Sequence, residues 1–231
     1  MTNRGTIDPP GTRLKRGVVR LIVVAAAILI SYCGFCATLI TTYRWIDPPT
    51  TTVQIQRRVE ALIGGREYSR TYEPRPASEI SPHILTSAIA AEDGRFLEHR
   101  GFDWDSIETA LREGRGRGGS TISQQLAKNL FLTTHRSYFR KGLELPLTFL
   151  IELLLPKDRI IELYVNVVEW GDGVYGAEAA ARHHYGVDSR NISRRQAAAM
   201  ASCLPDPRRR RPQVDGRYTN IILRRMDRMG Y

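Results

Sequence analysis

The sequence predicts a mainly α-helical domain that follows one membrane-spanning helix. Residues 21–43 carry no charged side chain, and this run of 23 residues exceeds the roughly 20 needed to cross a bilayer. Beyond it, helix signals dominate and strand-like alternation is scarce. The 231 residues are enough for one sizeable domain in addition to such an anchor.

The apolar run 21–43 has two interpretations, an uncleaved anchor or a secretory signal peptide. A signal peptide has an apolar region of about 7–15 residues and a small-residue cleavage site, so this longer run favours the anchor. Four basic residues precede it, namely Arg13, Lys15, Arg16 and Arg20, whereas only Arg44 follows closely. The positive-inside rule then predicts a cytoplasmic basic tail over residues 1–20 and a domain outside the cytoplasm.

The formal net charge of +10 is concentrated at the two ends of the chain. Residues 1–20 carry a net +4 and residues 207–231 a net +6, so the stretch between them is neutral. A nucleic-acid-binding domain would spread basic charge over its folded face, which argues against a nucleic-acid partner. Charge at the ends suits anionic lipid head groups better.

The three cysteines predict no disulfide framework. Cys33 and Cys36 lie inside the apolar run, where we expect them to act as small apolar residues, and Cys203 lies in an Ala-rich helix. His183 and His184 are adjacent, and neighbouring positions rarely share one metal ion.

Residues 44–73 are expected to form a linker or stalk, with a possible short helix and a break at Gly64–Gly65. The domain is then expected over residues 74–231. Ser81 and Pro82 are typical of a helix N-cap and first turn, and this helix is predicted to end at Glu92. A further helix is expected over residues 105–112.

The next helix is expected to start at Ser120 as its cap. Thr121, Gln125, Lys128 and Asn129 then share one face. This face contains a cation and no acid, so it suits an anionic ligand, although an ordinary polar face remains an alternative. A last core helix, capped by Asn191 or Ser193, should run through Leu204.

Arg140 and Glu144 stand four residues apart, which allows an intrahelical salt bridge. The apolar stretch 145–155 follows, and Pro146 within it predicts either a kink or a restarted helix. This run is too short for a second span, so a buried helix or one lying against the membrane is expected. The glycines between Trp170 and Gly176 suit a tight loop that brings backbone close to a sugar.

Residues 91–103 gather chemically active side chains around aromatic ones. Glu92, Asp93, His99 and Asp103 lie near Phe96, Phe102 and Trp104 in the sequence. Aromatic neighbours dehydrate a carboxylate and raise its pKa toward the range useful for proton transfer. The alternative is a solvated helix end.

These residues resemble the glycosyltransferase domain of peptidoglycan polymerases, specifically the monofunctional membrane-anchored members. The first family pattern is Glu92, Asp93, Phe96, His99 and Gly101, and the second runs over residues 118–129. Arg140, Lys141 and Glu144 match the third motif. The fourth covers residues 157–186, with His184-Tyr185-Gly186-Val187 where Tyr-Phe-Gly-Lys is usual, and the fifth covers residues 204–207, with Asp206 where Asn is common. No transpeptidase module is expected after it.

The resemblance implies a lysozyme-like domain with two lobes around a cleft, and polymerisation of lipid II with release of undecaprenyl diphosphate. It implies Glu92 as the general base, with Asp93 and His99 orienting it. Lys128 and Arg140 would stabilise the diphosphate. Glu144, the second catalytic residue expected, would position it, with a divalent cation (Mg or Mn) as the one cofactor considered. The remaining substrate-binding candidates are Phe96, Ser120, Thr121, Gln125 and Asn129.

The resemblance also implies where the protein works. The location would be the bacterial inner membrane, with a single span and a periplasmic catalytic domain serving cell-wall synthesis and cell shape. Its partners would be lipid II, the growing glycan strand, membrane lipids and other cell-wall synthesis or division proteins. Two rival classes are a lysozyme-like hydrolase or lytic transglycosylase, which has no diphosphate to stabilise, and an inactive envelope scaffold.

Overall fold

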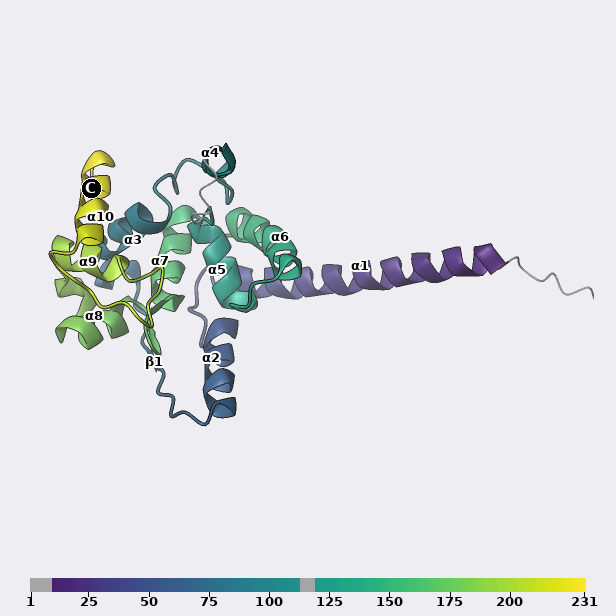
Figure 1. Cartoon of the computed structure of the whole chain (residues 1–231), viewed down its shortest axis with the longest axis horizontal. Coiled ribbons are helices and arrows are strands. Elements are labelled where there is room, and N and C mark those ends of the chain that lie inside the picture. Colours follow the sequence, from purple (N-terminus) through teal and green to yellow (C-terminus); the bar gives the residue numbers. More distant parts are fainter. Residues whose placement is uncertain (1–9, 113–118) are drawn as a thin grey trace, which may run out of the picture.

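The computed structural model describes residues 10–112 and 119–231. Residues 1–9 of the expected basic tail and residues 115–118, which include the first glycine of the second motif, lie outside the described residues. The expected mainly α-helical fold with one apolar N-terminal helix is confirmed. Figure 1 shows this helix, α1 (Pro10–Thr42), extending away from the other elements, which gather around its C-terminal end.

The remaining elements follow in chain order. They are α2 (Thr52–Ile63), β1 (Thr71–Tyr72), the 3-10 turn η1 (Ala77–Glu79), α3 (Pro82–Glu92), α4 (Trp104–Arg112), α5 (Ile122–Phe131), α6 (Tyr138–Leu154), α7 (Lys157–Val167), β2 (Glu169–Gly171), β3 (Val174–Tyr175), α8 (Ala177–Tyr185), η2 (Ser189–Asn191), α9 (Arg194–Ala201) and α10 (Arg217–Arg228).

Helix α1 is long and apolar enough over Lys15–Thr42 to cross a membrane, with a mean hydropathy of 2.3. Its C-terminal turns are part of the folded domain, because Cys36 and Ile40 are fully buried and α1 packs against α6. The Tyr32 hydroxyl donates to the Phe131 carbonyl at the end of α5, at 2.9 Å. Helix α1 is therefore joined to the domain by packing as well as by the chain.

Arg159 of α7 ties down the segment that leaves α1. Its guanidinium donates to the Tyr43 carbonyl at 2.8 Å and pairs with Asp47 at 2.9 Å. Since both contacts lie just beyond the last turn of α1, the exit angle of the chain is fixed by the domain.

Residues 44–73 contain the expected short helix and the break at Gly64–Gly65, and most of this stretch is folded onto the domain. The Thr51 hydroxyl accepts from Gln54 N and caps α2. Helix α2 packs on α5, where Thr52 donates to the Leu130 carbonyl at 2.8 Å, and Gln56 donates to Thr134 at 2.8 Å. Strand β1 then joins a small sheet.

The sheet has the order β1-β3-β2, with β1 parallel and β2 antiparallel to β3. Gly173, at φ +75°, lies where a Cβ would overlap the Ser69 carbonyl oxygen. Gly176, at φ +89°, would place a Cβ 2.7 Å from the Asn166 carbonyl oxygen. These glycines allow close approach of the chain to its own backbone. Close approach of this loop to a sugar stays a prediction.

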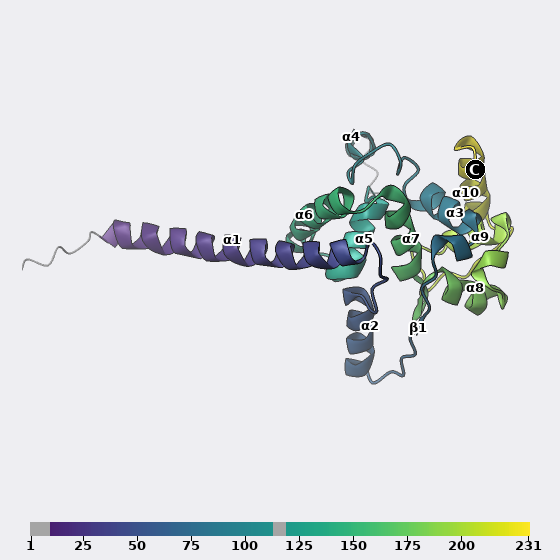
Figure 2. The ribbon, with the colours of Figure 1, turned by 180° about the vertical axis from the view of Figure 1, so that it is seen from behind.

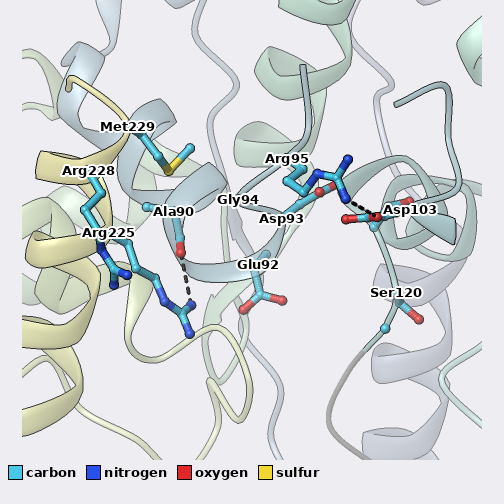
Figure 3. A pocket seen from close by; sticks show the side chains of 12 residues that line it. Ala90, Glu92, Asp93, Gly94, Arg95, Asp103, Ser120, Arg225, Arg228 and Met229 are labelled. Carbon is cyan, nitrogen blue, oxygen red and sulfur yellow. Dashed lines mark hydrogen bonds and ion pairs between the residues drawn. The ribbon is translucent and has the colours of Figure 1, made fainter. Parts of the chain in front are cut away.

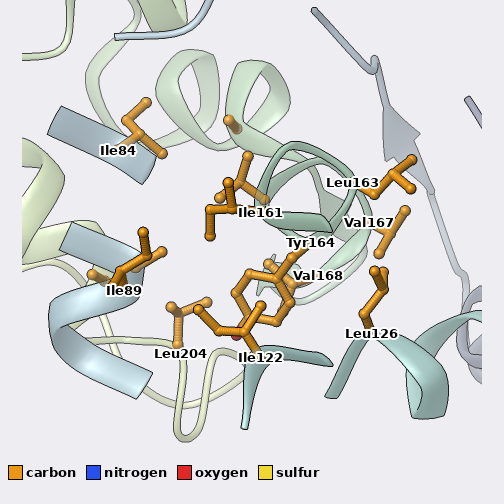
Figure 4. Close-up of a cluster of buried hydrophobic side chains, with 14 of the residues drawn as sticks. Ile84, Ile89, Ile122, Leu126, Ile161, Leu163, Tyr164, Val167, Val168 and Leu204 are labelled. Carbon is orange, nitrogen blue, oxygen red and sulfur yellow. The ribbon is translucent and has the colours of Figure 1, made fainter. Parts of the chain in front are cut away.

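The hydrophobic core lies where α3, α5, α7 and α9 meet. Helix α3 packs on α9, and α5 packs on both α6 and α7. Figure 4 shows Tyr164 of α7 at the centre, surrounded by apolar side chains of neighbouring elements such as Ile122 and Leu204. Burial of these side chains is the main force that holds the active-site helices together.

One of the expected helix caps is wrong. Thr121, and not Ser120, is the N-cap of α5, in a reciprocal capping box with Gln124. Ser81 is the N-cap of α3 and Pro82 its first residue, as expected, although the Ser81 hydroxyl donates to the Ile192 carbonyl and makes no cap hydrogen bond. Ser193 caps α9 as one of the two candidates suggested. Helix α6 runs through Pro146 without a restart.

Helix α9 ends at Ala201 and does not run through Leu204 as expected, and it is not the last core helix, because α10 follows it. Thr219, Ile222 and Met226 of α10 are buried, and the helix packs against α3 and α9. Their spacing of three and four residues is the helical signal that the arginine-rich composition obscured. Figures 1 and 2 show α9 and α10 at the end of the molecule opposite to α1. The arginines of α10 thus lie far along the molecule from α1, and the expected contact of this charge with lipid stays a prediction.

Candidate active site

Glu92 is the last residue of α3, and its side chain is held by neighbouring helices. The Gln125 side-chain amide of α5 donates to the Glu92 carboxylate at 2.8 Å. The buried Tyr164 hydroxyl of α7 donates in turn to the Gln125 amide oxygen at 3.1 Å. A chain of hydrogen bonds from the core thus fixes the orientation of this carboxylate.

Burial raises the pKa of Glu92 above its ordinary value, since a charged carboxylate loses hydration there. The hydrogen bond from Gln125 and the positive charges of Lys128 and Arg225 act in the opposite direction. The net result is a carboxylate that accepts a proton more readily than an exposed glutamate, as a general base requires.

An open cavity of about 440 Å³ gives Glu92 access to solvent. Figure 3 shows Glu92 between Arg225 and Arg228 of α10 on one side and Asp103 and Ser120 on the other. A substrate group in this cavity can therefore approach the carboxylate.

Asp93 supports the loop that follows α3. Its carboxylate contacts His99 Nε2 at 2.9 Å and accepts from the backbone N of Ile122 at 2.9 Å, in the first turn of α5. A helix N-terminus favours a negative charge, so this contact binds the loop to α5. Phe96 is fully buried, with Lys157 Nζ 4.3 Å from its ring centre.

The ligand atoms of Asp93, His99 and Asp103 lie within 4.8 Å of one another, a spacing that could hold a cation. However, the Arg95 guanidinium lies 3.3 Å from the Asp103 carboxylate, and Asp93 already accepts the two hydrogen bonds described above. Positive charge is thus supplied by the chain itself, and these residues do not fit a divalent cation well.

Glu144 is buried in α6 and is neutralised by two cations of its own helix. Arg140 lies 2.7 Å from one carboxylate oxygen, and the Lys141 ammonium contacts the other. Lys141 also donates to the Ser120 hydroxyl at 3.1 Å, which connects α6 to the cavity wall. Both oxygens of Glu144 are occupied, so a divalent cation on this carboxylate is not supported.

Lys128 of α5 interacts electrostatically with Glu92 and with the charged side chains of Arg140, Lys141 and Glu144 on α6. Burial lowers the pKa of Lys128, and the charge of Arg140 acts in the same direction, whereas Glu144 and Glu92 raise it. Lys128, Arg140 and Lys141 thus form a cluster of three cations around Glu144, which we call the cation cluster. The cluster suits an anion with more than one charge.

Two further candidates have different surroundings from those expected. The Thr121 hydroxyl is buried and committed, because it accepts from Gln124 N and donates to the Gly101 carbonyl at 2.7 Å. Asn129 is buried, and its Nδ2 has no hydrogen-bond partner among the residues that the structure describes.

Arg225 of α10 is a site residue that the sequence did not suggest. Its guanidinium donates to the carbonyls of Ala90 and Ala91 at 3.1 and 3.3 Å, at the end of the helix that carries Glu92. It therefore supports α3 and places a positive charge near Glu92. Only a prediction of α10 as a helix packed on α3 could have found it.

A family model described as "Transglycosylase" matches residues 58–229 of the chain. The chain is 47% identical over 184 residues to a biosynthetic peptidoglycan transglycosylase of Pseudomonas fluorescens, covering 78% of this chain and 77% of the relative. It is 44% identical over 204 residues to one of Stutzerimonas stutzeri, covering 87% and 84%. A relative of the same description from Rhodospirillum centenum is 43% identical over 205 residues, covering 87% of each chain.

Proposed function

The chain belongs to the transglycosylase family and is a peptidoglycan glycosyltransferase, and we propose that it polymerises lipid II with Glu92 as the general base. The transglycosylase domain is lysozyme-like, which agrees with the mainly helical fold. The proposal concerns the substrate, the residues and the membrane arrangement.

The acceptor in this reaction is the 4-hydroxyl of a lipid II sugar, which is a weak nucleophile. Glu92 takes the hydroxyl proton as the oxygen attacks the anomeric carbon of the donor glycan. A new glycosidic bond forms, the bond from the anomeric carbon to the diphosphate oxygen breaks, and undecaprenyl diphosphate leaves with the bonding electrons. Asp93 and His99 position the loop after Glu92 and touch no reacting atom.

The leaving diphosphate gains negative charge as its bond to the sugar breaks. Lys128, Arg140 and Lys141 stabilise that charge, because fixed cations in a partly buried site need no reorganisation. Arg140 and Lys141 are held in place by Glu144, which makes Glu144 a positioning residue in this proposal. Ser120 lies at the boundary between the cavity and the cation cluster.

A single observation carries the proposal. Glu92 has a raised pKa and faces an open cavity, and it interacts electrostatically with Lys128 of the cation cluster. A base next to a cation cluster suits transfer from a diphosphate donor, whereas a glycosidase needs an acid to protonate its leaving alcohol.

The position of α6 supports a membrane-bound substrate. Leu145, Phe149 and Leu153 stand four residues apart on α6 and are exposed, and α6 packs against α1. We therefore place this stripe at the surface of the inner membrane, with the amino terminus in the cytoplasm and the domain in the periplasm. Other cell-wall synthesis or division proteins as partners stay a prediction.

The test is turnover of purified full-length protein on lipid II. We expect glycan polymer and free undecaprenyl diphosphate, and no digestion of purified cell-wall sacculi. Lys128→Met removes a charge-assisted contact to phosphate and should slow polymerisation roughly 10- to 100-fold, since such a contact contributes about 1.5–3 kcal/mol.

Arg66→Met is the matched control, because Arg66 is exposed and lies far from the cation cluster in the sequence. This variant should polymerise at the wild-type rate. Release of soluble fragments from sacculi, with no polymer from lipid II, would favour the hydrolase, and inactivity in both assays would favour the scaffold.

A further inference from the structure

We propose that Arg217, Arg224 and Arg228 of α10 bind the carboxylate-bearing peptides of the peptidoglycan strand. The identity of the strand rests on the proposed function, whereas the surface itself follows from the structure. We call these three residues the arginine stripe.

The arginine stripe lies on one face of α10. At about 100° per residue, spacings of seven and four residues keep the three side chains within roughly 40° of one another around the helix. All three residues are exposed. The buried residues Thr219 and Met226 lie on the opposite face, so burial of α10 in the core forces the stripe outward.

The arginine stripe is not neutralised by the chain. The one acidic residue of α10, Asp227, pairs with Arg194 of α9 at 2.6 Å. Within the described residues, no carboxylate forms an ion pair with any of the three arginines. Like charges four residues apart, as at Arg224 and Arg228, destabilise a helix. A helix that keeps this repulsion at its surface is complementary to an anionic partner.

The location of the stripe separates it from the lipid. It lies on a helix at the end of the molecule opposite to α1 (Figures 1 and 2). Because surface charges are screened beyond about 8 Å at physiological ionic strength, this position favours a partner other than the head groups of the membrane that α1 would cross. The anionic partner that we infer is therefore a component of the surrounding compartment.

The stripe begins at the active-site cavity. Arg228 and Met229 line the cavity that contains Glu92 and also a second cavity of about 280 Å³, which extends to Leu97 and Tyr231. From Arg228 the stripe leads along α10 to Arg217, a rise of about 16 Å. A strand that passes the mouth of the cavity would therefore meet the stripe.

The chemistry of the strand matches the stripe at its peptides. The sugars of the backbone carry few charges, whereas the peptides carry free carboxylates. A guanidinium binds a carboxylate through two parallel hydrogen bonds, which favours arginine over lysine for this contact. The stripe would thus hold the strand by its peptides and leave the sugars free to move through the cavity.

The test compares two ligands that share one glycan. Full-length protein in detergent micelles is titrated with fluorescent uncrosslinked peptidoglycan strands. It is also titrated with the same strands after an amidase has removed the peptides and the sugar carboxylates that this hydrolysis exposes have been converted to amides. We expect roughly tenfold tighter binding of the peptide-bearing strands, the sum of three exposed ion pairs. The triple variant Arg217→Gln, Arg224→Gln and Arg228→Gln should lose this preference.

The control variant is Arg58→Gln, Arg66→Gln and Arg136→Gln, which removes the same charge from exposed positions elsewhere and should keep the preference. Thermal melting checks that both variants are folded. Equal affinity of the wild type for both strands would overturn the proposal without use of any variant. Weaker binding of the triple variant to anionic phosphatidylglycerol vesicles, with strand binding unchanged, would assign the stripe to lipid instead.

Strand binding is measured without lipid II, so it is independent of turnover. A protein that prefers peptide-bearing strands but makes no polymer from lipid II would contradict the proposed function and leave the binding surface intact. A protein that polymerises lipid II but binds stripped strands equally well would contradict only the surface.

Discussion

Glu92 carries a charge in a buried position, and the Glu92→Gln variant measures what that charge does. The variant keeps the size of the side chain and should lower polymerisation at least about 10²-fold, the scale of general-base catalysis. It should also raise the melting temperature at neutral pH, because the buried charge is removed. Turnover assays and thermal melting of the same preparation check both effects. Near-normal turnover would show that Glu92 is not the general base.

The pH dependence of these effects follows from the raised pKa of Glu92. Since the pKa in the folded state lies above that in the unfolded state, the protonated form stabilises the fold at low pH. That contribution is lost as the pH rises through the folded-state pKa. The stability gap between Glu92→Gln and wild type should therefore widen from acid to neutral pH, while wild-type activity rises over the same range.

Arg225 acts on Glu92 through charge and through the end of α3, and two variants separate these effects. Arg225→Gln removes a cation that lowers the pKa of Glu92, so the acid limb of the pH–kcat profile should move to higher pH. Arg225→Lys keeps the charge, so its acid limb in the pH–kcat profile should lie close to that of the wild type. A fall in kcat with no change in the limb would indicate a purely structural role.

The residue types of the site were predictable, but several of their contacts were not. Glu92, Gln125 and Lys128 could be proposed from the sequence, and the structure brings them together. Thr121 was expected to bind substrate, yet a helix cap competes for the same hydroxyl. Arg225 could not be assigned, because its partners on α3 lie about 135 residues away in the chain.

At the level of elements, the pairing of strands β1 and β3 depends on Gly173. Gly173→Ala should lower the stability by more than the roughly 1–2 kcal/mol of a left-handed residue, because its Cβ would also overlap the Ser69 backbone. Gly186→Ala is the control, since Gly186 has φ +68° and nothing within 4 Å of an added Cβ. Thermal melting should therefore place Gly173→Ala below Gly186→Ala, and equal values would contradict the steric argument.

The helices were more predictable than the sheet for a physical reason. Amphipathic helices such as α3 and α5 have a period that is visible over three turns. Strands β1 and β3 have two residues each, too few to show alternation, and their pairing joins Thr71 to Val174. Folding of residues 44–73 onto the domain depends on that long-range pairing, so the sequence suggested a linker instead.

At the level of the whole molecule, the charge asymmetry around α1 predicts the topology. An alkaline phosphatase fused after Tyr231 should be active, because this enzyme needs the oxidising environment outside the cytoplasm. A fusion placed before residue 10 should be inactive, which provides the matched control. A stable but inactive fusion after Tyr231 would contradict the proposed orientation.

The net charge illustrates what composition alone cannot resolve. Both basic ends of the sequence were assigned to lipid, because a count of charges contains no position in space. The fold turns α10 back onto α3 and α9 and leaves its arginines at the end remote from α1. Only the tertiary packing distinguishes the two basic segments.

The contacts of Tyr32 with Phe131, and of Arg159 with Tyr43, have a kinetic consequence. A domain on a flexible tether would sample many heights and tilts above a bilayer, and only some of them would present the cleft to a lipid. Here the anchor and the domain should diffuse and rotate as one body. Encounter with the substrate then becomes a two-dimensional search at constant height, in which lateral mobility of the lipid limits how often the cleft is filled.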